Sequence, residues 1–240
     1  MYSDQIVQGE RAAPTQLLKR CKELRSIPDR QVLNYAEQWF PITEALGLGA
    51  ASYLAVIVRE IRVADGRQRE TLEKILRHAA AISSDDLGLL RGATGGETVG
   101  PIHFRLFEQM CRKLGRVANA QNLLPETVRL RDAIRNLFDT FAGGIAAFRV
   151  IELIAYSVVE HQLPLFLAAE RSEIKLYTRD KLDYIRLHLQ IEGKHAAESD
   201  ELVGLLHESG GDMPVFEEHV EYLASMFEAY LRALEVHVLG

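Results

Sequence analysis

The sequence has few cysteines and no concentration of positive charge. Only two of its 240 residues are cysteines, Cys21 and Cys111, and they form no CxxC pair. A disulfide framework is therefore not indicated, and a reducing, cytoplasmic compartment is expected. The net charge is −6, the pI is about 5.8, and no basic run stands out. These values argue against binding to nucleic acid.

Long hydrophobic runs and secretory signals are also missing. The longest apolar-leaning stretch, residues 144–169, is interrupted by Arg149, Glu152, Glu160 and His161. It falls short of the roughly 18 uninterrupted apolar residues that a membrane-spanning helix requires. The first residues, MYSDQIVQGERAAPTQ, contain no apolar segment of the kind found in a signal peptide. We therefore expect no membrane partner.

Strand-like alternation, internal repeats and low-complexity tracts are absent as well, and helical periodicity takes their place. The composition, 48% hydrophobic and 26% charged, is ordinary for one globular domain of this length. We therefore predict a single all-α domain over residues 1–240. It should be a bundle of seven or more helices with a flexible start at residues 1–14. Sites in such bundles are built from inward-facing side chains on neighbouring helices.

Amphipathic patterns predict where the helices lie. The expected ranges are 15–27, 29–50, 51–66, 67–82, 101–115, 125–142, 144–173, 178–210 and 213–240, with a loop over 83–100. Individual residues should start, bend or end these helices. Asp29 and Thr178 are expected as N-caps, and Gly143, Gly144 and Gly210 as stops. Pro41 should kink or split its helix, and Pro164 should bend its own.

The most informative stretch is HLQIEGKH, residues 188–195. At about 100° per residue, His188, Glu192 and His195 fall within roughly 60° of one another on a helix. Two imidazoles and one carboxylate on one stripe form half of a metal site whose ligand types suit iron or manganese. The alternative is a polar helix face that happens to carry two histidines.

Two further stretches can supply the missing ligands. Glu160 lies among valines and leucines in AYSVVEHQLPLF, where a carboxylate is costly unless it is paired or bound to a metal. Its neighbour His161 points about 100° away, and Glu152, two turns earlier, is the rival for the same role. Glu97 lies in a glycine-rich loop before His103, which opens the next helix. The whole set suits two ferrous ions with open positions for dioxygen: Glu97, His103, Glu160, His188, Glu192 and His195.

A ferritin-like di-iron bundle would need two Glu-x-x-His pairs on separate helices, and only Glu192–His195 has this spacing. Instead, three motifs resemble, in order, those of the haem-oxygenase-like di-iron oxidases and oxygenases. This family is a branch of the haem-oxygenase/TenA-like helical fold that binds non-haem iron. ETVGPIHFRLFEQMCRKLG is similar to its Glu–loop–His segment, AYSVVEHQLPLF to its mid-helix Glu followed by a proline, and YIRLHLQIEGKHAAESDEL to its His-x3-Asp/Glu-x2-His helix.

The resemblance extends over residues 29–205, because DRQVLNYAEQWFPI is similar to the aromatic N-terminal helix of the family. The chain departs from the family in two places. The spacing between Glu97 and His103 is shorter, and Glu192 stands where aspartate is frequent. The first departure bears on the geometry of Glu97, and the second lengthens one ligand arm.

The resemblance implies a non-haem di-iron enzyme that uses two Fe(II) ions and dioxygen, together with an external electron donor where its reaction needs one. Members of the family hydroxylate amines, desaturate or fragment fatty and amino acids, cleave C–C bonds or form a nitrile. We expect this chain to oxidise an amino acid or another small carboxylate in natural-product biosynthesis.

A carboxylate substrate needs a cationic side chain near the metals. Arg149, three turns before Glu160 on the same expected helix, is the first candidate, and Arg105 and Lys194 are further ones. Tyr156, one turn before Glu160, is placed to hydrogen-bond a metal-bound species.

Three other classes stay open as alternatives. A metal-independent TenA-like hydrolase would use Cys111 as nucleophile, although the sequence places no base beside it. A haem protein would carry a lone histidine on its first helix, and residues 15–27 contain none. A non-catalytic helical binding protein is the third. The apolar face of residues 213–240 is compatible with a homodimer.

Overall fold

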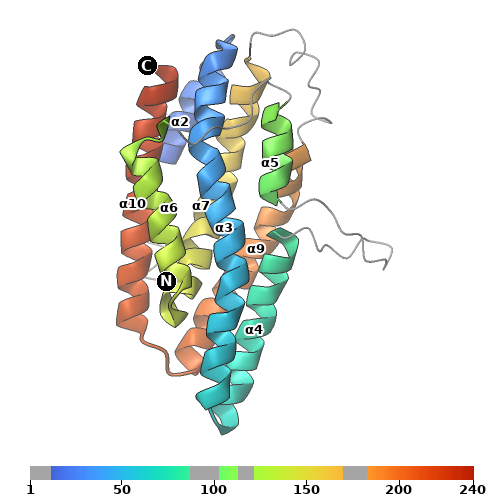
Figure 1. Ribbon diagram of the computed structural model, residues 1–240, viewed down its shortest axis with the longest axis vertical. Helices are drawn as coiled ribbons and strands as arrows, with labels where there is room; N and C mark the ends of the chain where they lie inside the picture. The colour runs from blue at the N-terminus through green and yellow to red at the C-terminus, as the bar shows by residue number, and fades with distance from the viewer. Residues whose placement is uncertain (1–11, 87–102, 113–121, 170–182) are drawn as a thin grey trace, which may run out of the picture.

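The chain forms an all-α bundle, as the periodicity predicts (Figure 1). The computed structural model describes residues 12–86, 103–112, 122–169 and 183–240. These ranges contain eight α-helices and no strand. The helices are α2 (Ala12–Glu23), α3 (Asp29–Val63), α4 (Gly66–Asp86), α5 (His103–Arg112), α6 (Pro125–Phe138), α7 (Phe141–Leu167), α9 (Asp183–Glu208) and α10 (Met213–Leu239).

Helix α3 is the central element and packs against α4, α5, α6, α7 and α10 (Figure 1). An 18-residue window of α3 has a mean hydropathy of 1.5, so by length and composition alone this helix could cross a membrane. The sequence analysis overlooked this stretch. Within the bundle 56% of the window is buried, as in the core helix of a globular protein.

Two predicted features of α3 are wrong. The helices expected over 29–50 and 51–66 form one continuous helix of 35 residues, so Pro41 does not split it. Pro41 is itself buried, and packing of α3 against five other helices outweighs the one backbone hydrogen bond that proline removes. Asp29 is the first helical residue rather than the N-cap, a position taken by Pro28, and no side chain caps this end.

The boundary between α6 and α7 also differs from the prediction. Helix α6 ends at Phe138, and Gly143 and Gly144 lie in the first turn of α7 instead of terminating α6. The Tyr53 ring of α3 packs directly on Gly144, where a Cβ atom would lie only 2.6 Å from Cζ and even closer to two other ring carbons. Gly144 is therefore required by close packing between α3 and α7 rather than by a turn.

The other boundaries agree with the prediction in part. Helix α2 ends at Glu23, before the expected stop, and the following chain pairs with the end of α7 through a 2.8 Å bond from Ile27 N to Ala168 O. Helix α9 stops as predicted, with Gly210 at a φ of 74° that favours glycine. Thr178 lies outside the described residues. The two halves of α7, Phe141–Ile154 and Val158–Leu167, meet at 46°, ahead of the bend expected at Pro164.

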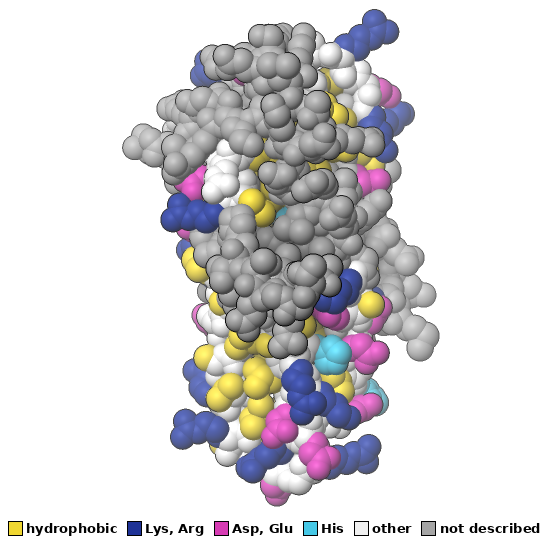
Figure 2. Space-filling model, turned by 90° about the vertical axis from the view of Figure 1, so that its right-hand side faces the viewer, with side chains coloured by type: hydrophobic (Ala, Val, Ile, Leu, Met, Phe, Trp, Pro, Cys, Tyr) yellow, Lys and Arg dark blue, Asp and Glu magenta, His cyan; other side chains and the backbone are white. Residues whose placement is uncertain are grey.

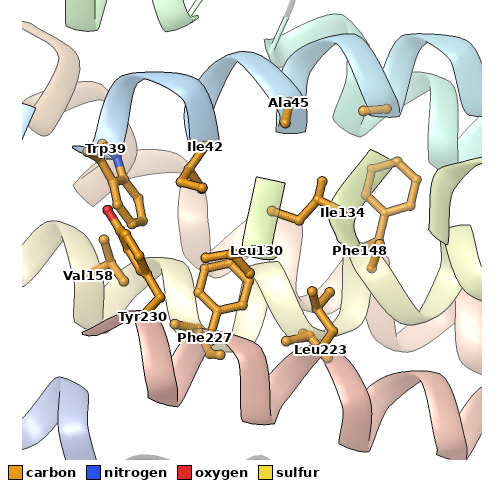
Figure 3. Close-up of a cluster of buried hydrophobic side chains, with 14 of the residues drawn as sticks. Trp39, Ile42, Ala45, Leu130, Ile134, Phe148, Val158, Leu223, Phe227 and Tyr230 are labelled. Atoms are coloured by element: carbon orange, nitrogen blue, oxygen red, sulfur yellow. The ribbon is translucent and has the colours of Figure 1, made fainter. Parts of the chain in front are cut away.

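The core lies where α3, α6, α7 and α10 meet (Figure 3). Its side chains are mostly aliphatic and aromatic, and its largest fully buried members include Tyr35, Tyr53 and Tyr230. A buried amide joins two of the helices. Gln38 donates to Asn122 O and accepts from Leu124 N and Thr127 Oγ1, which fixes the start of α6 against α3.

Charged side chains of both signs are interspersed over the described part of the face shown in Figure 2, with apolar atoms between them.

Candidate functional site

Helices α7 and α9 make the most extensive helix–helix contact among the described elements. Two polar contacts across it define the direction of the pair. Arg149 Nη2 lies 2.7 Å from Asp200 Oδ1, and Glu152 Oε2 lies 3.7 Å from His195 Nδ1. As the residue number rises on α7 it falls on α9, so the two helices are antiparallel. We refer to this contact as the α7–α9 interface.

The Glu152–His195 pair is the strongest feature of the α7–α9 interface. The two side chains are only 6% and 3% exposed, respectively. Such burial is costly for an ionisable pair unless its atoms bind one another, other polar groups or a metal ion. Their separation of 3.7 Å is longer than a hydrogen bond. Two donor atoms about 2.1 Å from one ion, at angles of 90–120°, lie about 3.0–3.6 Å apart. The pair therefore fits a shared metal ion in ligand type, and its separation of 3.7 Å lies just above this range.

His188 is held in a defined orientation two turns before His195. Its Nδ1 lies 2.8 Å from Tyr184 O, and its ring lies 4.1 Å from the Tyr184 ring. A carbonyl oxygen can only accept, so Nδ1 carries a proton, and in the neutral form of the ring Nε2 would be the lone-pair donor. Metal-binding histidines are commonly fixed in this way, with the second ring nitrogen donating to a backbone carbonyl.

Glu160 is placed differently from Glu152. Glu160 is half-buried, whereas its neighbour His161 is fully buried and lies on another face of α7. Glu160 lies beyond the 46° bend of α7, and Glu152 is the carboxylate of this helix with a described contact to a predicted ligand.

Three of the predicted ligands have no described side chain. Glu97 lies outside the described residues, and so do the side chains of His103 and Glu192, although their backbones belong to α5 and α9. In α5, Phe107 contacts Tyr184 of α9 at a ring distance of 5.0 Å, so His103 and His188 each lie one turn from this contact. Within the described side chains, no group of three or more His, Cys, Asp or Glu residues is close enough to hold a metal ion.

The four predicted substrate-binding residues have different surroundings. Arg149 is 4% exposed and is bound within the chain, since it donates to Ser199 Oγ at 3.2 Å and pairs with Asp200. Its guanidinium thus joins α7 to α9. The other two cations are exposed and pair along their own helices, Arg105 with Glu108 and Lys194 with Glu198. The side chain of Tyr156 lies outside the described residues.

Sequence reasoning missed a buried polar cluster on the opposite side of α7. The Tyr35 hydroxyl and His161 Nε2 lie 2.9 Å apart, both fully buried, and the Gln162 side chain is also fully buried. The sequence did contain a signal, because the polar pair His161–Gln162 interrupts an otherwise apolar segment of α7. His161 and Gln162 are both more deeply buried than Glu160, the residue predicted there as a ligand.

Comparison with known proteins adds no assignment: no protein-family model matches the chain, and no curated protein is significantly similar to it.

Proposed function

We propose that the α7–α9 interface binds iron and that the chain is a non-haem di-iron, dioxygen-activating oxidase or oxygenase. Its expected substrate is an amino acid or another small carboxylate. The observation that carries the proposal is the buried Glu152–His195 pair, whose donor atoms are 3.7 Å apart on two facing helices. The same helices carry His188, Glu160 and Glu192, which we infer to be further ligands.

Each described residue has a specific task in this proposal. Glu152 and His195 would hold one ion from opposite helices. His188, fixed by Tyr184 O, would present Nε2 towards the metals. Iron, when bound, would supply dioxygen activation. The buried surroundings of the pair would exclude bulk water, which strengthens the interaction between a carboxylate and a cation.

Arg149 has a positioning task rather than a substrate-binding one. Its contacts with Ser199 and Asp200 fix α9 against α7 one turn away from the Glu152–His195 pair. A metal site built from two helices loses affinity when the helices shift, because ligand positions must hold within about 0.5 Å. The group that binds a substrate carboxylate would then come from another part of the chain.

The alternative of a metal-independent hydrolase is less well supported. Cys111, its only nucleophile candidate, is 2% exposed. Burial, followed by the nearby Glu108 carboxylate, raises the pKa of this thiol well above its ordinary value. The thiol therefore stays protonated at neutral pH, whereas a nucleophilic cysteine needs thiolate. A non-catalytic binding protein is the second alternative, and it would bind no stoichiometric iron.

The test is an anaerobic titration of the metal-free protein with Fe(II), followed by measurement of tightly bound iron. We expect about two irons per chain in the wild type and a loss of at least one after His195→Ala. His207→Ala is a matched control on the same helix, since His207 is exposed and should leave the iron content unchanged.

The titration is repeated with candidate amino acids, followed by oxygen-uptake measurements on the loaded protein. Oxygen uptake that depends on both iron and an amino acid would support the oxygenase assignment. Absence of stoichiometric iron under both conditions would refute it and leave the two metal-free alternatives.

A further inference from the structure

Three buried side chains in the core have polar atoms without a hydrogen-bond partner among the described residues. They are Trp39 on its Nε1, Gln162 on its Oε1, and Tyr230 on its hydroxyl. Their exposed fractions are 4%, 0% and 0%. Buried polar groups in native proteins are nearly always hydrogen-bonded, so each of these atoms needs an explanation.

The three side chains belong to one cluster, which we call the Trp39 cluster: Tyr35, Trp39, His161, Gln162 and Tyr230. The rings of Trp39 and Tyr230 lie 5.8 Å apart, and the rings of Tyr35 and Trp39 lie 6.4 Å apart. In Figure 3 the Tyr230 hydroxyl points from α10 towards the Trp39 indole on α3. On α7, Gln162 follows His161. Burial raises the pKa of the Tyr35 hydroxyl, and a hydrogen bond from the Gln162 side chain opposes this rise.

Elsewhere the same core satisfies its buried amide and hydroxyl groups with partners. Gln38, one residue before Trp39, makes three hydrogen bonds with its amide. Tyr53, as deeply buried as Tyr230, donates its hydroxyl to Phe141 O at 2.6 Å. The unpartnered atoms are thus a local property of the Trp39 cluster rather than of this core in general.

We propose that the Trp39 cluster encloses a binding site for a small neutral molecule that both donates and accepts hydrogen bonds, of which water is the smallest example. The indole N–H can only donate, so the bound molecule must accept. The Gln162 carbonyl oxygen can only accept, so the molecule must also donate. The unpartnered groups are all neutral, and a bound charge would lack the paired counter-charge that burial requires. Three aromatic rings provide apolar walls.

This site does not depend on the proposed iron site. His161 and Gln162 are fully buried and lie towards α3, whereas Glu152 lies against α9. The experiments below use metal-free protein, so their failure would leave the iron proposal unaffected.

The single tryptophan makes the site directly observable. In a ¹H–¹⁵N spectrum of the protein the indole of Trp39 gives the only tryptophan side-chain signal. We expect a hydrogen-bonded chemical shift and a cross-relaxation peak from the indole proton to bound water or to a non-protein molecule. Mass spectrometry of a denatured extract distinguishes an organic ligand from water. An indole shift typical of a free N–H, without either cross-peak, would overturn the proposal.

One variant gives an independent test by the sign of a stability change. If the site is occupied, Tyr230→Phe removes a hydrogen bond and should lower the melting temperature, by about 2–4 °C in a protein of this size. If the Tyr230 hydroxyl is unpartnered in a dry core, the same replacement should raise it. Tyr53→Phe is the matched control, because it removes a known hydrogen bond and should lower the melting temperature in either case.

Discussion

Alanine should destabilise the fold at Gly144 and stabilise it at Gly204, although both glycines lie inside helices. A Cβ atom at Gly144 would overlap the Tyr53 ring, at 2.6 Å from Cζ. That ring cannot withdraw easily, because it packs against Phe138 and Phe148 and its hydroxyl is bound to a backbone carbonyl of α7. At Gly204, by contrast, nothing lies within 4 Å of the added Cβ.

The expected magnitudes follow from three terms. Overpacking a core costs typically about 1–3 kcal/mol, and a displaced Tyr53 would lose a hydrogen bond of about 0.5–1.5 kcal/mol. Replacing glycine by alanine within a helix returns up to about 1 kcal/mol. Gly144→Ala should therefore lower the free energy of unfolding by about 1–3 kcal/mol, or the melting temperature by roughly 3–10 °C. Gly204→Ala has only the favourable term and should raise the melting temperature by roughly 1–4 °C.

Thermal and urea denaturation followed by circular dichroism would measure both changes. Gly49→Ala provides a second buried position, because its Cβ would overlap the Phe138 ring. If Gly144→Ala left stability unchanged or increased it, the close contact between α3 and α7 would be refuted. The boundary predicted from sequence, with Gly144 ending a helix, would then become the better description.

Three further predictions concern the interface, the thiols and the metal ligands. Arg149→Met should lower the free energy of unfolding by about 1–2 kcal/mol, because buried hydrogen bonds to α9 are lost. Lys194→Ala, which removes an exposed ion pair, should change the free energy of unfolding by less than about 0.5 kcal/mol. Urea denaturation of the two variants measures both changes. Burial and then Glu235 raise the pKa of the Cys21 thiol from 9.0 to about 12. As the pH rises, the thiol loses its proton in the unfolded chain before it does so in the folded chain, so the free energy of unfolding should fall above a pH of about 9. This fall should be less steep in the Cys21→Ala variant. An equal dependence of stability on pH in both proteins would contradict this cause. Finally, Glu152→Gln should weaken iron binding at least 10-fold, as measured by equilibrium dialysis. A larger loss of affinity in Glu160→Gln would contradict this expectation and identify Glu160 as the principal ligand from α7.

Periodicity was sufficient to predict the fold class and most helices. The buried face of α4, with Leu72, Ile75 and Ala79, matches its apolar spacing. Errors arose where tertiary packing outweighs a local signal. Pro41 lies within a continuous helix, and Gly144 marks a contact with Tyr53 rather than a helix end. A sequence cannot distinguish a glycine that ends a helix from one that lets another helix approach, because the contact lies about 90 residues away.

The candidate site shows the same limit. Spacing along one helix was enough to place His188 and His195 on one stripe, because both belong to α9. The choice between Glu152 and Glu160 depends on how α7 faces α9, which residue spacing within α7 does not specify. The buried contact between Glu152 and His195 favours the carboxylate that we had treated as the rival. Similarly, the apolar sequence around Glu160 concealed that His161 and Gln162 are the more deeply buried residues.

Anomalous diffraction at the iron edge, from crystals grown or soaked with Fe(II) under anaerobic conditions, would locate any metal ions between α7 and α9. We expect anomalous peaks at the α7–α9 interface, with at least one at about 2.0–2.3 Å from Glu152 Oε2 and His195 Nδ1. Peaks elsewhere in the chain, or none in crystals that diffract well, would contradict this prediction.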